Sequence, residues 1–201
     1  METQTFYSNG KLLLTGEYVV LDGAEALAVP TCFGQNLVVK EGTSDFLKWT
    51  SFDADKSIWF TDTIPIDAIK NNTSSAQNSL IKNTLIEILY HAHIQNPKVL
   101  EGVGFEVETH LSFPRNWGLG TSSTLINNIA QWLQIDAYRL LETSFGGSGY
   151  DIACAQNNTD QQTTEISQQA LTISATDFKK AIDQPGAQIL DVRTVGEFKS
   201  G

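Results

Sequence analysis

Apolar and polar residues alternate along the first 156 residues in patterns that predict strands first and helices afterwards. Short apolar runs separated by glycine, aspartate and serine are typical of strands and the turns between them. Such runs occupy residues 11–21, 35–40, 46–51 and 57–61. Apolar side chains then recur at helical spacing over residues 78–94, and Pro97 follows as a stop signal, so we expect a helix there.

The pattern continues as one more strand followed by further helices. Residues 104–113 alternate as a strand that places one set of side chains on the same face, namely Phe105, Val107, Thr109 and Leu111. Helical spacing returns at residues 122–133 and 136–142, and small residues predict a short helix over 152–155. This mixture of strands and helices predicts an α/β domain over residues 1–156.

The chain changes character after residue 156. Residues 157–170 are rich in asparagine, glutamine and threonine and nearly free of apolar side chains, which is typical of a linker. From residue 171 the pattern resumes with a short strand, a helix near 176–182 and an apolar strand at 188–192. A segment of about thirty residues is too short to form an independent core. We therefore divide the chain into residues 1–156, a junction at 157–170 and a partial unit at 171–201.

Composition narrows the class of protein. The 201 residues include 13 Lys and Arg against 23 Asp and Glu, and the resulting net charge of −10 disfavours a nucleic-acid surface. No stretch approaches the roughly eighteen apolar residues of a membrane span, and the opening residues lack the pattern of a secretory signal. Cys32 and Cys154 cannot build a disulfide framework, and we interpret both as small core residues. We expect a cytoplasmic protein with a small-molecule substrate and with neither nucleic acid nor membrane as partner.

A loop rich in glycine and hydroxyl groups lies between the strand predicted at 104–113 and the helix predicted from 122. It consists of Gly118, Leu119, Gly120, Thr121, Ser122 and Ser123. Glycine lets the backbone turn sharply and approach a ligand closely. The free N–H groups at a helix start favour an anion such as phosphate, and hydroxyl groups there can reach phosphate or Mg²⁺. A glycine turn with a Ser/Thr N-cap explains the short string equally well.

The longer string at residues 114–124 resembles the phosphate-loop motif of the GHMP kinases, named for galactokinase, homoserine kinase, mevalonate kinase and phosphomevalonate kinase. Residues 10–23 are similar to the opening motif of that family, closest to its mevalonate kinase form. Residues 146–153 are similar to the string that carries its catalytic aspartate, in the Gly-Tyr-Asp-Ile-Ala form. The three strings occur in the family's order, so the resemblance covers about residues 6–156.

The resemblance implies a fold of the ribosomal-protein-S5-domain-2 type, with ATP and Mg²⁺ as cofactors. It also implies ATP-dependent phosphorylation of a small alcohol of the mevalonate class, with the loop Gly118–Ser123 on the ATP phosphates. The family normally has a second, C-terminal domain that completes the substrate cleft, and residues 157–201 do not resemble that domain.

Individual residues suggest roles that agree with this resemblance. Asp151 is a lone carboxylate in a glycine-rich turn and can accept the proton of a substrate hydroxyl; the alternative is an ordinary helix N-cap. Lys11 precedes an apolar strand and can pair with Asp151 or contact the transferred phosphoryl group; the alternative is a surface lysine. The resemblance further implies that Glu17 contacts the substrate or orients Lys11, and that Ser122 approaches Mg²⁺. Glu142 is the only acid nearby that could ligate the metal.

The end of the chain carries a second resemblance. Residues 173–182 and 188–201 are similar to the opening third of a rhodanese domain. The sulfur-carrying cysteine of that family comes later, and no cysteine follows Cys154, so we expect no persulfide chemistry from this segment. Three functions stay open at this point: a GHMP-type kinase, a rhodanese-type sulfur carrier or binding module, and a nucleotide-binding fragment without turnover.

Overall fold

The computed structural model describes residues 3–15, 27–100, 104–146 and 149–157. Contacts divide the chain into a unit at Met1–Asn158 and a second unit at Thr159–Gly201. The second unit lies outside the described residues, as does the junction from residue 158 onward. The rhodanese-like segment at 171–201 and the boundaries around it therefore stay predictions.

The described part of the first unit contains a five-stranded sheet in the order β1-β2-β5-β3-β4. Neighbouring strands are antiparallel except for the central pair β3 and β5, which run parallel. A parallel pair requires a crossover connection, and here the connection contains β4 and two helices. The strands are β1 (Thr3–Thr15), β2 (Leu27–Glu41), β3 (Phe46–Phe52), β4 (Ile58–Pro65) and β5 (Phe105–Leu111).

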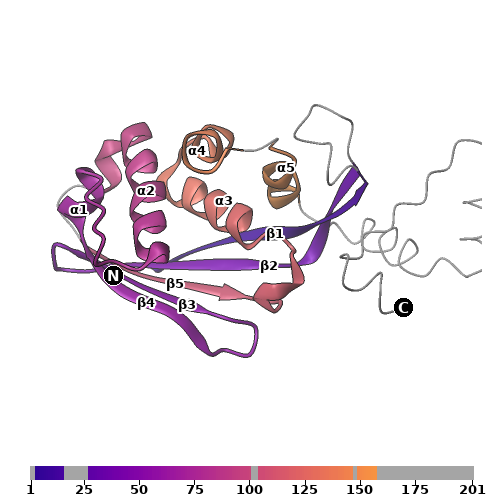
Figure 1. Cartoon of the computed structure of the whole chain (residues 1–201), viewed down its shortest axis with the longest axis horizontal. Coiled ribbons are helices and arrows are strands. Elements are labelled where there is room, and N and C mark those ends of the chain that lie inside the picture. Colours follow the sequence, from indigo (N-terminus) through magenta and orange to yellow (C-terminus); the bar gives the residue numbers. More distant parts are fainter. Residues whose placement is uncertain (1–2, 16–26, 101–103, 147–148, 158–201) are drawn as a thin grey trace, which may run out of the picture. The chain divides into compact units, whose positions relative to one another are not determined.

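Helices cover one face of this sheet, as Figure 1 shows. They are α1 (Ile66–Lys70), α2 (Leu80–Gln95), α3 (Thr121–Leu133), α4 (Ala137–Ser144) and α5 (Tyr150–Gln156), with short 3₁₀ turns η2 (Pro97–Leu100) and η3 (Arg115–Trp117). The predicted α/β class is confirmed for the described residues. The helix expected over 78–94 begins at Leu80 because the Ser79 side chain caps it, accepting a hydrogen bond from the Lys82 backbone N–H.

Two strands are longer than the sequence pattern predicts. Strand β1 begins at Thr3 rather than at residue 11, because its first half is mostly polar apart from Phe6 and Tyr7 and forms no apolar run. Strand β2 begins at Leu27, eight residues before the predicted start at 35, and its first half pairs only with β1. The predicted strand at 11–21 is described only as far as Thr15. The short helix α1 was not predicted.

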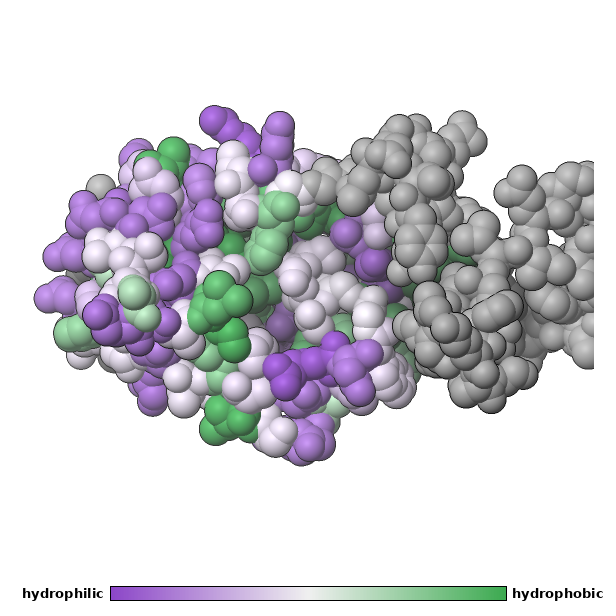
Figure 2. All heavy atoms as spheres, in the orientation of Figure 1, coloured by the Kyte–Doolittle hydropathy of each residue, from purple (hydrophilic) through white to green (hydrophobic). Residues whose placement is uncertain are grey.

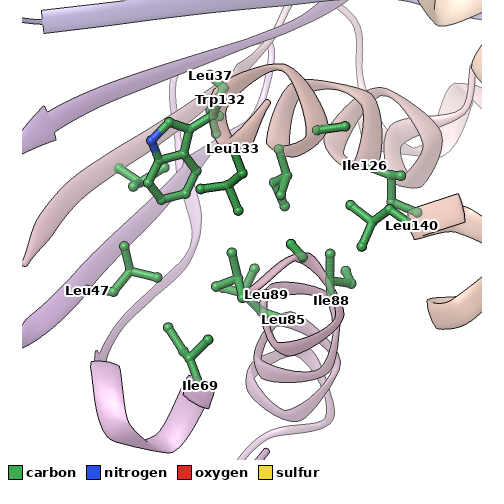
Figure 3. Packing of buried hydrophobic residues seen from close by; sticks show 14 of the residues in the cluster. Leu37, Leu47, Ile69, Leu85, Ile88, Leu89, Ile126, Trp132, Leu133 and Leu140 are labelled. Atoms are coloured by element: carbon green, nitrogen blue, oxygen red, sulfur yellow. The ribbon is translucent and has the colours of Figure 1, made fainter. Parts of the chain in front are cut away.

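The hydrophobic core lies between the sheet and helices α2 and α3. Figure 3 shows Leu85 and Leu89 of α2 facing Leu133 of α3, with Leu47 from the sheet beside them. The side chains at 105, 107, 109 and 111 are all buried, which confirms the alternation predicted for β5. Cys154 is buried as predicted, but the prediction for Cys32 is wrong. Cys32 is exposed because it lies in the part of β2 that β5 does not pair with.

The surface in view in Figure 2 is mostly hydrophilic, with hydrophobic residues gathered near the middle of that face. Among the helices that the structure describes, none combines the length and the apolar character required to cross a lipid bilayer.

Candidate active site

The loop at 118–123 forms the start of helix α3. Gly118 (φ 71°) and Gly120 (φ 84°) both adopt the left-handed conformation that favours glycine. The first helical hydrogen bond runs from the Thr124 N–H to the Gly120 carbonyl at 3.0 Å. No side chain caps this end of the helix. The backbone N–H groups of the first turn therefore point away from the helix without an intrahelical acceptor.

The hydroxyl groups of the loop have different surroundings. Ser123 is buried, and its Oγ donates a hydrogen bond to the Gly120 carbonyl at 2.9 Å, which closes the loop on itself. Ser122 is exposed, and its hydroxyl makes no hydrogen bond within the described part of the chain. Leu119 is buried against Leu111 and Phe113 and anchors the loop to the domain. Ser122 is thus the hydroxyl that a ligand can reach, whereas Ser123 stabilises the loop.

Strand β1 touches this loop through its backbone. The Lys11 N–H donates a hydrogen bond to the Leu119 carbonyl at 2.9 Å. The β1–β2 register shifts between Asn9 and Lys11, so the strand is irregular at the contact. A Cβ on Gly10 would lie 2.9 Å from the Leu119 carbonyl oxygen, a distance that no larger residue tolerates. Gly10 therefore permits the strand and the loop to approach each other.

The Lys11 side chain runs from the loop to helix α5. A Cβ added at Gly120 would lie 3.2 Å from Lys11 Cγ, so the side chain passes directly beneath the loop. Its Nζ lies 3.3 Å from Asp151 Oδ1 and donates a hydrogen bond to Tyr150 Oη at 3.0 Å. Burial acts to lower the pKa of Lys11, but the Tyr150 hydrogen bond and the Asp151 charge outweigh it and raise that pKa. The ammonium group is therefore held in its charged form.

Asp151 lies in the first turn of α5, facing Lys11. Its side chain is 28% exposed and that of Lys11 is 17% exposed, so the pair is shielded but reachable. The N-cap position belongs to Gly149, and no side-chain hydrogen bond caps the helix. Asp151 Oδ1 is buried and accepts no well-aligned hydrogen bond, so its contact with Lys11 is an ion pair only. A carboxylate in this state retains the capacity to accept a proton.

A pocket of about 450 Å³ opens beside the loop. Thr121 and Ser122 line it on the side of α3, and the first turns of α2 line it on another side. Its walls are largely apolar and include four aromatic side chains, those of Trp49, Trp59, Phe60 and Phe145. Arg115 lies over the Trp59 ring at 4.5 Å from the centroid, and its Nε pairs with Asp53 Oδ2 at 3.1 Å.

Two polar atoms at this pocket lack partners. Trp59 Nε1, a donor, and Thr109 Oγ1, a donor and acceptor, are both buried without a hydrogen bond. Buried polar atoms are normally satisfied, so an unpaired one in a pocket wall points to a ligand or a water that completes it. A flat apolar ligand with polar ring atoms fits this lining.

A buried network of polar side chains fixes the position of helix α3. Asn127 Nδ2 donates to Ser8 Oγ at 2.8 Å, and Ser8 Oγ donates to Asn128 Oδ1 at 2.8 Å. Asn128 Nδ2 in turn donates to the Gln35 carbonyl of β2 at 2.9 Å. Gln156 of α5 joins through Asn127 Oδ1 at 3.2 Å. The network connects β1, β2, α3 and α5, the elements that carry the loop, Lys11 and Asp151.

The structure does not bring every predicted residue to the site. Glu17 lies outside the described residues. Glu142 is exposed on α4 and makes no ion pair or hydrogen bond with the loop or with Asp151 in the described part of the chain. No group of three metal-ligating side chains occurs within the ranges that the structure describes.

Sequence reasoning missed Tyr150 and the place of Trp59 in the pocket wall. Tyr150 stands next to Asp151 in the same string, and that adjacency was the available signal. Trp49 is a buried core residue that also lines the pocket. Nothing in the spacing of Trp59 distinguishes a pocket wall from a core. Trp117, which immediately precedes the loop, packs edge-on against Phe33, is 55% exposed and is not among the residues that line the pocket.

The fold matches solved structures that include a mevalonate kinase and a galactokinase. The mevalonate kinase of Methanococcus jannaschii superposes with a TM-score of 0.55 at 15% identity, covering 75% of this chain and 51% of that one. The galactokinase of Lactococcus lactis, solved with galactose, gives a TM-score of 0.53 at 14% identity, covering 81% and 41%. The Lin0012 protein of Listeria innocua gives 0.57 at 16%, covering 92% and 55%.

These likenesses show the fold and no more, because all three identities are at or below 16%. No family model and no curated protein matches the chain. The chain spans about half the length of the kinases that it resembles in structure. The described domain therefore has a mixed α/β fold similar to that of these kinases.

Proposed function

We propose that this chain is the nucleotide-binding part of a small-molecule kinase that transfers a phosphoryl group from ATP to an alcohol. The observation that carries the proposal is the course of Lys11. Its backbone touches the glycine loop at Leu119, and its ammonium group lies 3.3 Å from the Asp151 carboxylate. One residue thus joins an anion-binding helix start to a carboxylate that can act as a base, and phosphoryl transfer to an alcohol needs both.

The loop and the pocket supply complementary parts of an ATP site. The free N–H groups at residues 121–123 suit the phosphates, as does the positive end of the α3 dipole. The aromatic pocket beside Thr121 and Ser122 suits the base, and its unpaired Trp59 Nε1 and Thr109 Oγ1 suit polar ring atoms. The free Ser122 hydroxyl is the group in this loop that is placed to contact Mg²⁺. Bound MgATP would supply the transferable phosphoryl group and neutralise part of its charge.

Asp151 and Lys11 divide the chemistry between them. The Asp151 carboxylate accepts the proton of the substrate hydroxyl and so increases its nucleophilicity. The Lys11 ammonium offsets negative charge on the transferred group and holds the carboxylate in place. Burial of both side chains strengthens these interactions because less water screens them.

The acceptor belongs to the class of small alcohols, and we propose one of the mevalonate type. The structures with the same fold include both a mevalonate kinase and a galactokinase, so the fold itself does not distinguish between these acceptors. Glu17 remains the proposed substrate contact. Because the chain spans about half the length of those enzymes, a second domain would complete the acceptor site. Because the match covers only about half of each of those enzymes, one alternative is also favoured, a nucleotide-binding fragment without turnover.

Calorimetry with MgATP, followed by an ADP-release assay with mevalonate and galactose, tests the proposal. Asp151→Asn should keep MgATP binding within about threefold and lower turnover by about 10²- to 10⁴-fold, the usual contribution of a positioned base. Asp136→Asn is the matched control, because Asp136 caps α4 and asparagine caps a helix equally well. It should leave binding and turnover unchanged.

The outcomes separate the alternatives. Absence of MgATP binding by the wild-type chain would refute the proposal as a whole. Binding without turnover, with every acceptor tried, would identify the fragment alternative. Turnover that survives Asp151→Asn at the wild-type rate would remove Asp151 from the mechanism.

A further inference from the structure

Tyr150 contacts Lys11 more closely than Asp151 does. The hydrogen bond from Lys11 Nζ to Tyr150 Oη measures 3.0 Å, whereas the ion-pair distance from Nζ to Asp151 Oδ1 is 3.3 Å. The ammonium group also lies 5.0 Å from the centroid of the Tyr150 ring. Asp151 Oδ1 accepts no aligned hydrogen bond from Lys11 or from any other group that the structure describes. The phenol, and not the carboxylate, therefore fixes the direction of the ammonium group.

This arrangement matters for a carboxylate that must accept a proton. A lysine that donates a short, aligned hydrogen bond to a carboxylate stabilises its charged form and makes it a weaker base. A lysine that donates its hydrogen bond to a neighbouring hydroxyl instead keeps its positive charge near the carboxylate without forming a hydrogen bond to the carboxylate oxygen. Within the described residues, the ammonium group has no polar contact other than those with Tyr150 and Asp151.

We propose that Tyr150 is a positioning residue for the proposed phosphoryl transfer. Its hydroxyl holds Lys11 beside Asp151 but not in a close hydrogen-bonded pair with it, so that the partly exposed Asp151 carboxylate stays available to the substrate proton. The inference rests on the proposed function for its catalytic consequence. The contact on which it depends can be measured without turnover.

The first test measures the reactivity of Lys11 itself. Only a neutral amine reacts with acetic anhydride, so the labelling rate at a fixed alkaline pH reports the neutral fraction of Lys11. Burial acts to lower the pKa of Lys11, and the groups that raise it are the Tyr150 hydroxyl and the Asp151 carboxylate of α5. The Cys154 thiol of the same helix also interacts with the Lys11 charge. Tyr150→Phe removes the hydroxyl and keeps the ring. Lys11 should then label about fivefold faster, which corresponds to about 1 kcal/mol for one hydrogen bond.

Tyr138→Phe is the matched control for this substitution. Tyr138 lies on α4, packs against the start of α5 near Gly149, and makes no hydrogen bond through its hydroxyl within the described ranges. The same chemical change there should leave the labelling rate of Lys11 and all activity unchanged. Peptide mass spectrometry resolves Lys11 from the other lysines in both variants.

The second test separates binding from turnover. With the hydroxyl gone, the Lys11 ammonium group is no longer held in one direction beside Asp151, so kcat should fall about tenfold or more, as is usual when a reacting group is misplaced by a fraction of an ångström. The Kd for MgATP, measured by calorimetry, should change by less than about threefold, because the loop amides are untouched. Unfolding in urea verifies that both phenylalanine variants are folded.

Each outcome decides one part of the proposal. Unchanged Lys11 labelling in Tyr150→Phe would show that the phenol does not hold the lysine and would overturn the inference. Faster labelling with an unchanged kcat would overturn the positioning role while leaving the proposed function intact. A wild-type chain that does not bind MgATP would overturn the proposed function, and the catalytic role of Tyr150 with it.

Discussion

Replacing Gly120 with alanine tests whether the glycine loop owes its shape to the absence of a side chain. Gly120 has a φ of 84°, and an added Cβ would lie 2.7 Å from Ser123 Oγ and 3.2 Å from Lys11 Cγ. A left-handed conformation costs an alanine about 1–2 kcal/mol. Displacing the Ser123 hydroxyl from the Gly120 carbonyl loses a hydrogen bond worth about 1 kcal/mol. We expect Gly120→Ala to lower the free energy of unfolding by about 2–3 kcal/mol.

Gly118→Ala provides the comparison. Gly118 has a φ of 71° but nothing within 4 Å of an added Cβ, so its substitution carries the backbone strain without the crowding. The loss should stay at about 1–2 kcal/mol. Denaturation in urea, fitted for both variants and the wild type, measures the difference between them.

The binding measurement links this strain to function. In Gly120→Ala the displaced Lys11 stem and Ser123 hydroxyl should reorient the first amides of α3, so MgATP should bind at least about tenfold more weakly, a loss of about 1.4 kcal/mol. Gly118→Ala should weaken binding less. The reasoning fails if the two variants lose equal stability and Gly120→Ala, still folded, binds MgATP as the wild type does.

Other parts of the domain lend themselves to equally direct tests. The pKa of Lys11 is raised above its ordinary 10.5, so the stability that its contacts add is complete below that pH and is lost as the pH rises through the folded-state pKa. The free energy of unfolding in urea should therefore fall more steeply above about pH 10.5 for the wild type than for Lys11→Met. Parallel curves of this free energy against pH would contradict the prediction. Burial and the Asp151 charge raise the pKa of the Cys154 thiol. At about pH 8 a thiol reagent should therefore modify the exposed Cys32 quickly and the buried Cys154 only on unfolding, and equal modification rates at the two cysteines would refute this prediction. Leu89→Ala should lower the free energy of unfolding by about 2–5 kcal/mol, because Leu89 is fully buried. Leu80→Ala on the same helix should lower it far less, because the Leu80 side chain is 82% exposed. Similar losses for the two variants would contradict the described core.

The elements with strong periodicity were predictable from the sequence. Helices α2 and α3 and strand β5 have apolar positions at regular spacing because each presents one face to the core. The first half of β1 could not be found in this way, since an edge strand with polar residues has no apolar run to detect. The sheet order could not be predicted either, because the parallel pairing of β3 with β5 depends on contacts that no local pattern encodes.

The parts of the site that depend on glycine residues or on charged side chains were predictable from the sequence, whereas the parts that depend on side-chain packing were not. The loop at 118–123 stands out because glycines and hydroxyls between a strand and a helix are uncommon elsewhere in this chain. The approach of Lys11 to Asp151 was expected from the resemblance, and the structure places them 3.3 Å apart. The role of Tyr150 depends on the direction of one hydrogen bond, and the pocket depends on which aromatic side chains leave space between them. Neither property has a signature in a single sequence.

The position of Lys11 on an edge strand determines when the site can exist during synthesis of the chain. Its contact with Tyr150 joins residues 139 positions apart, and Ser8 meets Asn128 across 120 positions. Strand β1 leaves the ribosome first, yet its functional partners in α3 and α5 emerge almost at the end of the domain. Contacts so distant in sequence form late because closing the chain over them costs entropy. A nascent chain that ends before α5 can therefore have its complete sheet while it still lacks the lysine–aspartate pair. If the proposed nucleotide site is correct, a nucleotide that contacts both the loop and this pair would bind only after the domain has finished folding.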